Sequence, residues 1–276
     1  MRRIALASSA AWPELADDDR LLIPALQQLD VEAVPVVWDG PVDWTRFDQV
    51  VIRSCWDYHL RPDEFLDWID ELEKAEVKVQ NLPGLLRWNT DKRYLRQLRA
   101  AGATIPPTIW IEDREELSSN EILDRLGWSS AIVKPTVSAS AHNLRRVFRE
   151  EPAVQLKGPA ILQQFIPEIV SRGEWSLVFL GGKYSHAVIK RPAAGEFRVQ
   201  SEFGGRVELA EPRAELVEDA TEVVDSVPEK PLYARIDGID CDGTLVLMEV
   251  ELIEPELFLG LGKAANRFAE EIARVH

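Results

Sequence analysis

Charged side chains occur at strand spacing in two runs near the C-terminal end of the chain. One run is 235–237 (Arg-Ile-Asp), the other is 249–251 (Glu-Val-Glu), and the turn signal Asp-Gly at 242–243 lies between them. Apolar residues that alternate with polar ones on both sides of a glycine-containing turn are typical of a β-hairpin. Because alternate residues of a strand point to the same side, the charged residues of each run share one face of this hairpin.

A loop centred on Gly243 would place Asp237 opposite Glu249 and Arg235 opposite Glu251, with all four charged side chains on one surface. Carboxylates that converge in this way repel one another unless a cation lies between them. Hard oxygen ligands suit Mg²⁺ that is held together with substrate phosphates. We therefore predict a magnesium site at Asp237, Glu249 and Glu251, in preference to an exposed strand face with scattered charges, because the opposite sides of both strands are apolar.

Basic and hydroxylated side chains elsewhere in the chain suit a phosphorylated ligand. The expected strand 131–134 (Ala-Ile-Val-Lys) ends at Lys134, and the loop after it has small side chains, including Ser138 and Ser140. Backbone N–H groups of such a loop can approach phosphates, because its side chains project little. Lys190 and Arg198 add positive charge ahead of the acidic hairpin.

The first part of the chain alternates strands with helices, which indicates a small parallel α/β domain. In such sheets ligands bind beyond the carboxyl ends of the strands, where Arg53 and Asn81 fall. Arg53 is a candidate for holding a substrate carboxylate because its forked guanidinium matches that shape, and a surface arginine is an equally open alternative. The expected strands are 2–7, 31–38, 48–53 and 77–80, and the expected helices are near 21–29 and at 63–75.

The rest of the chain mixes strands and helices without an internal repeat. A glycine pair at 181–182 predicts a second hairpin over 174–191. The other expected strands are 108–111 and 160–166, and the expected helices are 89–101, 115–126, one around 216–223, and a C-terminal helix from about 256 to 275.

Composition limits the class of protein. The formal net charge of −15 argues against a general nucleic-acid binder, whose affinity comes from Lys and Arg. No apolar run approaches the length of a membrane helix, and the N-terminus lacks a secretory signal, so we expect a cytoplasmic protein with no membrane partner. Cys55 and Cys241 lie far apart in unlike contexts and are expected to be free thiols.

The order of these parts resembles the ATP-grasp ligases, and most closely their bacterial glutathione synthetase branch, along nearly the whole chain. The resemblance implies that Lys92 and Lys134 contact the nucleotide phosphates and that Glu174 binds the ribose. It also implies that the linker 162–167 (Leu-Gln-Gln-Phe-Ile-Pro) reads adenine, which adds Gln163, Gln164, Phe165 and Ile166 to the candidate nucleotide-binding residues. Arg53 and Asn81 resemble that branch's substrate-binding positions.

Two departures from the family pattern concern the phosphates and the metal. The loop that covers the phosphates is usually glycine-rich and is Ser-Ala-Ser-Ala at 138–141, which leaves its closure open. The second metal ligand is Glu251 where the family has asparagine, which is still an oxygen donor. Runs at 173–176 and 190–198 look closest to little-studied relatives that include the cyclo-ligase making cycloserine.

The resemblance implies an α/β chain with an ATP-grasp fold behind an N-terminal Rossmann-like domain. The expected parts are a substrate domain at 1–88, a central subdomain at 89–160 and a C-terminal subdomain with the metal site at 161–276. The implied reaction is ATP- and Mg²⁺-dependent ligation of a small amino-acid-like carboxylate to an amine through an acylphosphate, in which Arg235, Lys190 and Arg198 act on the transferring group. A kinase, an intramolecular cyclo-ligase and a nucleotide-binding protein without catalysis stay open, as do the two substrates and the oligomeric state, with a homodimer as one alternative.

Overall fold

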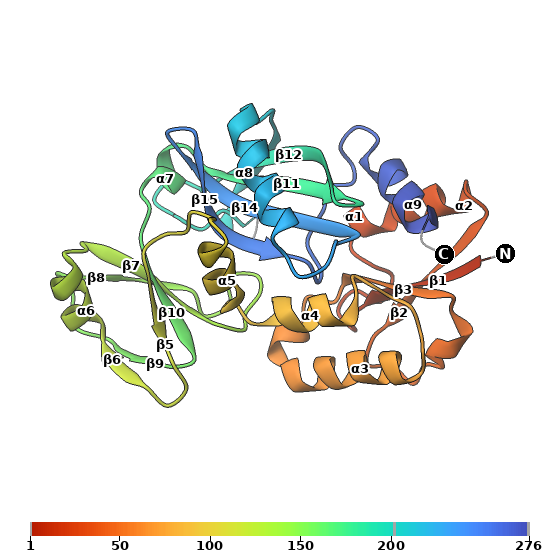
Figure 1. Ribbon diagram of the computed structural model, residues 1–276, viewed down its shortest axis with the longest axis horizontal. Helices are drawn as coiled ribbons and strands as arrows, with labels where there is room; N and C mark the ends of the chain where they lie inside the picture. Colours follow the sequence, from red (N-terminus) through yellow and green to blue (C-terminus); the bar gives the residue numbers. More distant parts are fainter. Residues whose placement is uncertain (1, 201–202, 275–276) are drawn as a thin grey trace.

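The computed structural model describes residues 2–200 and 203–274 and contains three main sheets (Figure 1). The first is parallel, with strand order β2-β1-β3-β4. Its central strands are buried runs of β-branched and small apolar residues, as expected for a sheet covered on both faces. Its elements are β1 (Arg2–Ser8), α1 (Asp17–Arg20), α2 (Leu22–Gln27), β2 (Val31–Val37), η1 (Trp44–Arg46), β3 (Gln49–Ser54), η2 (Tyr58–Leu60), α3 (Pro62–Lys74) and β4 (Val79–Gln80).

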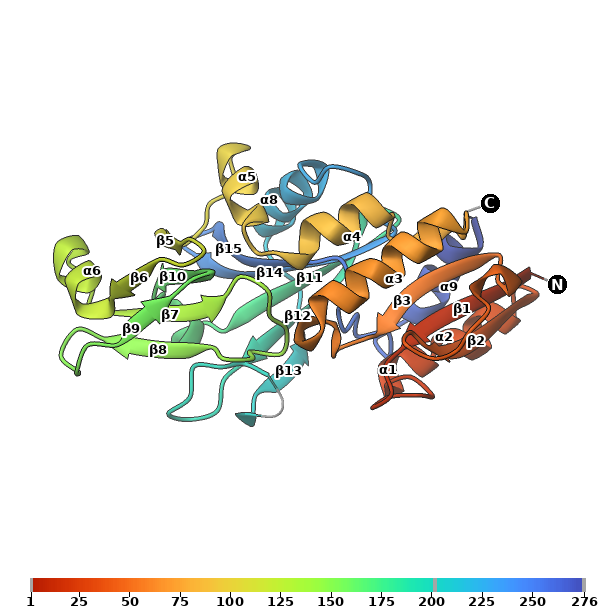
Figure 2. The ribbon, with the colours of Figure 1, turned by 90° about the horizontal axis from the view of Figure 1, so that it is seen from below.

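Helices from both ends of the chain cover this parallel sheet. Ile4 and Leu6 of β1 pack with α2 and with α9 (Ala264–Arg274), whereas Ala5 and Ala7 pack with Phe65 and other residues of α3. The two termini therefore lie at the same end of the molecule (Figures 1 and 2). The predicted parallel α/β arrangement of this region is confirmed.

The second sheet is antiparallel and has the strand order β5-β10-β7-β8. Helix α6 covers one of its faces through Ile122 and Leu123. Its elements are β5 (Thr108–Ile111), α6 (Ser119–Leu126), β7 (Ser130–Pro135), β8 (Arg145–Phe148) and β10 (Ala160–Gln164), with a small separate ladder between β6 (Glu116–Ser118) and β9 (Gln155–Lys157).

The third sheet, also antiparallel, has the strand order β13-β12-β11-β14-β15. Helices α5 and α8 cover the face that carries Leu177 and Ile236. On the other face, Val178 packs in the core of the parallel sheet, and Asp237 and Ile239 line the space toward the second sheet. Its strands are β11 (Glu174–Leu180), β12 (Lys183–Arg191), β13 (Arg206–Leu209), β14 (Tyr233–Cys241) and β15 (Thr244–Glu251). The remaining helices of this part of the chain are α4 (Pro83–Thr90), α5 (Tyr94–Ala100), α7 (Glu168–Ser171) and α8 (Ala214–Asp225). The predicted 174–191 hairpin is confirmed.

Three helix predictions were wrong in their bounds. The helix expected at 89–101 is two helices, because Asp91 is extended and its carboxylate accepts hydrogen bonds from the Arg93 N–H and the Thr136 hydroxyl. The helix expected from 115 begins at Ser119, since the residues before it pair with β9. The last helix begins at Ala264 rather than near 256, because Leu257 and Leu259 enter the core from an irregular segment; position 275 lies outside the described residues.

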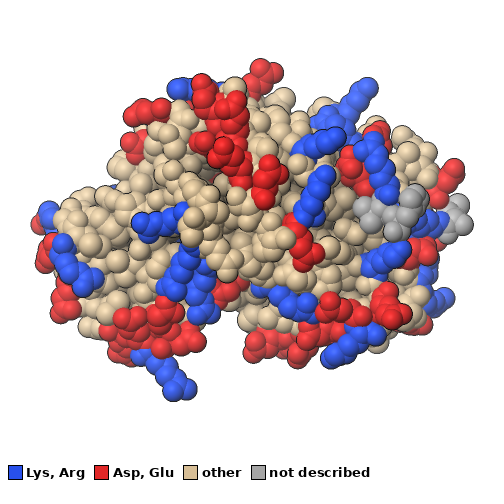
Figure 3. Space-filling model, in the orientation of Figure 1, with Lys and Arg blue, Asp and Glu red and all other residues tan. Residues whose placement is uncertain are grey.

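Three observations concern the cysteines, the surface charge and the length of the helices. Cys55 and Cys241 are free thiols. On the face shown in Figure 3, basic side chains are interspersed with acidic ones. Within residues 2–200 and 203–274, none of the helices is long and apolar enough to cross a membrane.

Candidate active site

A cavity of about 550 Å³ lies between the second and third sheets and reaches the parallel sheet. All of the predicted site residues except Arg53 and Asn81 line it. They are Lys92, Lys134, Ser138, Ser140, Gln163, Gln164, Phe165, Ile166, Glu174, Lys190, Arg198, Arg235, Asp237, Glu249 and Glu251.

The acidic hairpin has the predicted register. Arg235 pairs with Glu251 and Asp237 with Glu249 across β14 and β15. The turn is not the odd-length loop that was expected, because Asp242 and Gly243 form a two-residue turn with positive φ at both positions. A β-bulge opposite the step from Asp237 to Gly238 restores the register.

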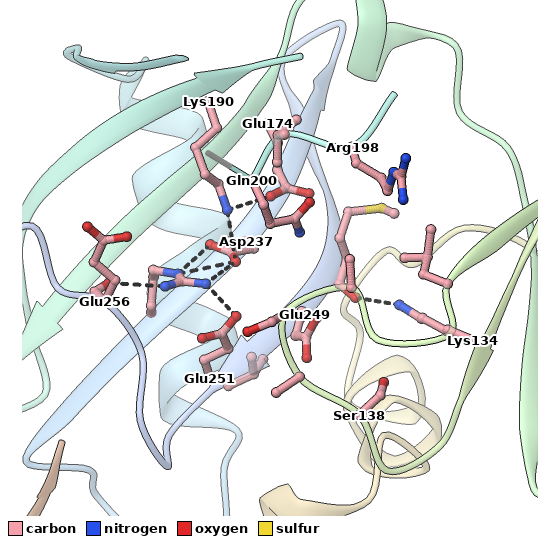
Figure 4. Close-up of a pocket in the computed structure, with 18 of the residues that line it drawn as sticks. Lys134, Ser138, Glu174, Lys190, Arg198, Gln200, Asp237, Glu249, Glu251 and Glu256 are labelled. Carbon is pink, nitrogen blue, oxygen red and sulfur yellow. Dashed lines mark hydrogen bonds and ion pairs between the residues drawn. The ribbon is translucent and has the colours of Figure 1, made fainter. Parts of the chain in front are cut away.

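Asp237 is held by cations of the protein (Figure 4). The Arg235 guanidinium donates to both of its oxygens, at 3.0 Å from Nε and 2.9 Å from Nη2, and also pairs with Glu251. The Ser176 hydroxyl and the Lys190 ammonium donate to it at 2.5 and 3.2 Å. Burial alone would raise the pKa of Asp237, but Arg235 and Lys190 outweigh it and hold that pKa below its usual range.

Lys190 joins Asp237 to the predicted ribose ligand. Its ammonium lies 2.6 Å from a Glu174 oxygen and 3.2 Å from an Asp237 oxygen (Figure 4). Burial raises the pKa of Glu174, and the Lys190 charge offsets only part of this effect. The two carboxylates and two cations therefore form one buried network from β11, β12 and β14.

The predicted metal ligands have the right chemistry but do not form a preformed cluster. Glu249 pairs with Lys92 at 2.9 Å, whereas Glu251 pairs with Arg235. In the part of the chain that the structure describes, no group of three His, Cys, Asp or Glu side chains is arranged to hold a metal ion. Burial, with Asp237 and Glu249 nearby, raises the pKa of Glu251 to about 7, so an added cation among these oxygen donors would relieve repulsion. The donor set therefore fits Mg²⁺ bound together with phosphates, and does not fit an ion bound by the protein alone.

Lys92 and Lys134 lie where the two sheets meet. Lys92 donates to the Ser138 carbonyl, and the buried Lys134 ammonium lies 3.4 Å from the Met248 carbonyl. Burial lowers the pKa of Lys134 to about 8, an effect that Glu249 only partly offsets. The loop that contains Ser138 has positive φ at Ser140, so its glycine-free sequence still adopts a backbone normally favoured by glycine.

The opposite end of the cavity is lined mainly by apolar side chains and contains one polar atom without a hydrogen-bond partner. Ile132, Phe165, Ile239 and Met248 belong to one apolar cluster there. The Gln163 side chain donates to the Thr108 hydroxyl at 3.2 Å, while its Oε1 atom is buried without a hydrogen-bond partner. An apolar region with an unused acceptor suits an aromatic base that carries an amino group.

Arg53 and Asn81, which were predicted to contact substrate, do not line the cavity. Arg53 is fully buried; it donates to Asp19 at 2.8 Å and to the Pro255 carbonyl. The Asn81 side chain donates to the Tyr233 and Leu252 carbonyls and accepts from backbone N–H groups of β14 and the residue before it. Both side chains are used to join the parallel sheet to distant segments of the chain.

One end of the cavity, next to the parallel sheet, is lined by residues that the sequence did not single out as site residues. They are Trp12, Asp18, Glu254 and Glu256, and Trp56 from the loop after β3 lies beside them. Burial, with Glu251 nearby, raises the pKa of Glu254 to about 8. The signal that could have identified Glu254 is its place in the Glu-Pro pair shortly after the hairpin, where a charged residue beside a core segment is unusual.

The parallel sheet followed by two antiparallel sheets that enclose a lysine- and carboxylate-lined cavity is the ATP-grasp fold. The chain has the fold of the ATP-grasp ligases and, by its full-length similarity to one of them, is an ATP-dependent ligase that forms C–N bonds.

Comparison with known proteins shows which ATP-grasp ligases this chain resembles. The family model described as "D-cycloserine synthetase DcsG, N-terminal domain" matches residues 4–81. The chain is 29% identical to the cycloserine biosynthesis protein DcsG of Streptomyces lavendulae over 98% of this chain and 97% of that protein. It is 30% identical to a glutathione synthetase of Parasynechococcus marenigrum over 52% of this chain and 47% of that protein.

Comparison with solved structures also finds ATP-grasp ligases. The crystal structure of D-cycloserine synthetase DcsG superposes with a TM-score of 0.83 at 27% identity and covers 98% of both chains. D-Alanine–D-alanine ligase from Bacillus anthracis complexed with ATP superposes with a TM-score of 0.70 at 19% identity, over 99% of this chain and 96% of that one. The second likeness supports the fold alone.

Proposed function

We propose that this ligase joins the carboxylate of a small amino-acid-like substrate to an amine through an acylphosphate, with release of ADP and phosphate. The observation that carries the proposal is the set of buried cations, Arg235, Lys190, Lys92 and Lys134, that line one cavity together with carboxylates. Phosphoryl transfer depends mainly on positioning and on neutralising charge, so a site of this kind needs cations more than it needs a nucleophile.

The nucleotide is proposed to lie across the cavity. Lys92, Lys134, Ser138 and Ser140 would bind the phosphates, and the linker from Gln163 to Ile166 would bind adenine. The unpartnered Gln163 Oε1 supports this orientation, because it can accept from the adenine amino group. The ribose is assigned to Glu174, whose ion pair with Lys190 would hold it in place.

Asp237, Glu249 and Glu251 are proposed to hold Mg²⁺. When bound, the ion supplies positive charge that offsets the charge of the β- and γ-phosphates. Glu249 and Glu251 are the more accessible of the three, with 28% and 25% of their side chains exposed against 5% for Asp237. Asp237 therefore also serves to fix Arg235 and Lys190.

The chemistry consists of two displacements. A substrate carboxylate oxygen attacks the γ-phosphorus, and the bond between that phosphorus and the β–γ bridging oxygen breaks to release ADP. The amine nitrogen then attacks the acyl carbon, the carbon–oxygen bond breaks, and that oxygen leaves with phosphate while the amine loses a proton. Arg235, Lys190 and Arg198 would stabilise the transferring phosphoryl group and the oxyanion that forms at the acyl carbon.

An intramolecular version is a second candidate. The full-length similarity to a protein of cycloserine biosynthesis favours a substrate that carries both the acid and the nitrogen nucleophile. One-substrate kinetics distinguishes the two versions, because a cyclo-ligase consumes ATP with a single substrate and is not stimulated by an added amine. We propose that either reaction takes place on small molecules in the cytoplasm.

The proposal is tested with the purified protein, Mg·ATP, a panel of small acids and hydroxylamine as the amine. The expected products are a hydroxamate and ADP in equal amounts. Release of AMP and pyrophosphate would contradict the acylphosphate route, and a stable phosphorylated alcohol would identify a kinase. Lys134→Ala should weaken ATP binding much more than adenosine binding, because only the phosphate contact is lost.

A further inference from the structure

Glu254 is a buried carboxyl group that lines the cavity without forming an ion pair, although the more distant Lys92 and Arg235 act to lower its pKa. Only 6% of the residue is exposed, and it follows β15 in the segment that lines the end next to the parallel sheet. Apart from its own backbone N–H, no group within the described part of the chain donates a hydrogen bond to its side chain or forms an ion pair with it. Glu249 and Glu251, by contrast, are paired with Lys92 and Arg235.

A second carboxylate at this end also has an unused oxygen. Asp18 Oδ1 accepts from the Gly260 N–H at 3.2 Å, and Oδ2 is buried with no partner among the described residues. The adjacent Asp19 cannot supply a free acceptor in the same way, because Arg53 and Ser54 bind its two oxygens. Arg53 also donates to the Pro255 carbonyl, so one guanidinium ties the neighbours of Asp18 and Glu254 together.

Two tryptophans form an aromatic wall beside these carboxylates. The Trp12 and Trp56 rings meet edge to face with centroids 5.4 Å apart. Trp56 Nε1 donates to the Glu254 carbonyl at 3.0 Å, which fixes the backbone that carries the carboxylate. Indole rings offer no oxygen to a metal ion, whereas their faces attract organic ammonium groups.

Burial without an ion-pair partner disfavours the charged form of a carboxyl group, so a cationic ligand that binds beside it supplies the interaction that the fold does not. We propose that Glu254 and Asp18, bounded by Trp12 and Trp56, bind the ammonium group of the acid substrate. The proposal deepens the function given above and rests on it: the substrate is a small amino acid with a free amine, and its carboxylate points toward Arg235.

The test compares serine with glycerate, in both configurations, because each pair differs only in an ammonium and a hydroxyl. Binding is measured by ligand-observed NMR to the protein saturated with Mg²⁺ and a non-hydrolysable ATP analogue. The variants are Glu254→Gln and Asp18→Asn, with Glu218→Gln as a control that removes an exposed carboxylate of α8 outside the cavity. Thermal unfolding and nucleotide affinity are recorded for each.

We expect at least one enantiomer of serine to bind roughly tenfold or more tightly than the matching glycerate in the wild type, as for loss of one charge-assisted contact. Glu254→Gln should abolish this preference, keep the nucleotide affinity and its Mg²⁺ dependence, and unfold at the same or a higher temperature. Glu218→Gln should behave as wild type. Asp18→Asn should reduce the preference and keeps the test valid if Glu254→Gln fails to fold.

Four results would overturn the ammonium site. They are equal binding of serine and glycerate, a preference that survives in both variants, an altered Mg²⁺ dependence in Glu254→Gln, and absence of binding by all four compounds while the nucleotide binds normally. Failure of the wild type to bind the Mg²⁺–nucleotide complex would instead contradict the proposed function, so the two failures are distinguishable.

Discussion

Lys134 makes nucleotide affinity depend on pH in a way that can be worked out from its surroundings. Its ammonium is buried between the two antiparallel sheets, and burial lowers its pKa to about 8 in the free protein. Phosphates next to it favour the charged form, so nucleotide binding raises this pKa and takes up a proton when the free lysine is neutral. The contribution of this contact to affinity is therefore full below about pH 8 and is lost as pH rises from that value to the higher pKa of the complex.

The magnitude follows from the fraction of charged lysine. At about pH 9 a group with this pKa is roughly one-tenth charged, so affinity for a nucleotide should fall about tenfold relative to neutral pH, which is about 1.4 kcal/mol. Isothermal titration calorimetry of the Mg²⁺ complex of a non-hydrolysable ATP analogue measures both this loss and the proton uptake, the latter from buffers that differ in ionisation enthalpy.

Two variants isolate Lys134 from other titrating groups. Lys134→Arg stays charged throughout this range and should show little loss of affinity, whereas Lys134→Met should bind weakly at every pH. A wild-type affinity that stays constant up to about pH 9, or the same slope in Lys134→Arg, would refute the assignment of this lysine to the phosphates.

Three further changes test separate parts of the account. Glu249→Gln keeps the shape of a metal ligand but removes its charge, so Mg·ATP turnover should collapse while the unfolding temperature is retained; wild-type turnover would rule out the metal assignment. Asn81→Leu leaves buried backbone groups unpaired and should lower the free energy of unfolding by about 2–4 kcal/mol in urea, whereas a neutral effect would show that those hydrogen bonds are dispensable. Arg53→Met leaves the buried Asp19 without its cation and should lower the free energy of unfolding by about 3–5 kcal/mol. Adding Asp19→Asn should recover part of this loss. No recovery would argue against the broken ion pair as the cause of the loss.

The charged face of the hairpin could be predicted because strand alternation is local. Asp237 and Glu249 are separated by a short stretch whose turn residues are recognisable, so their pairing follows from the sequence. The Asp-Gly pair at 242–243 is itself a signal for the two-residue turn, whereas the compensating bulge could not be predicted, because no local signal marks where one residue of β15 is left unpaired. The predicted pairing of Asp237 with Glu249 is therefore correct, but a two-residue turn and a bulge produce it in place of the odd-length loop that was assumed.

The roles of Arg53 and Asn81 could not be read from their positions alone. The rule for parallel sheets placed both at the correct edge, but it does not say which polar groups face a ligand and which join other segments. Their partners at Pro255 and Tyr233 lie far along the chain, and only the docking of those segments decides the outcome. The same docking creates the cavity end with Glu254.

The central claim is that the substrate carboxylate is activated by phosphoryl transfer, and isotope transfer tests it most directly. The acid found to stimulate ADP release is labelled with ¹⁸O in its carboxylate and turned over with Mg·ATP and the amine, or alone if it cyclises. The account predicts that released phosphate carries one ¹⁸O atom, because the acylphosphate oxygen leaves with phosphorus. Unlabelled phosphate, or AMP as the nucleotide product, would contradict it.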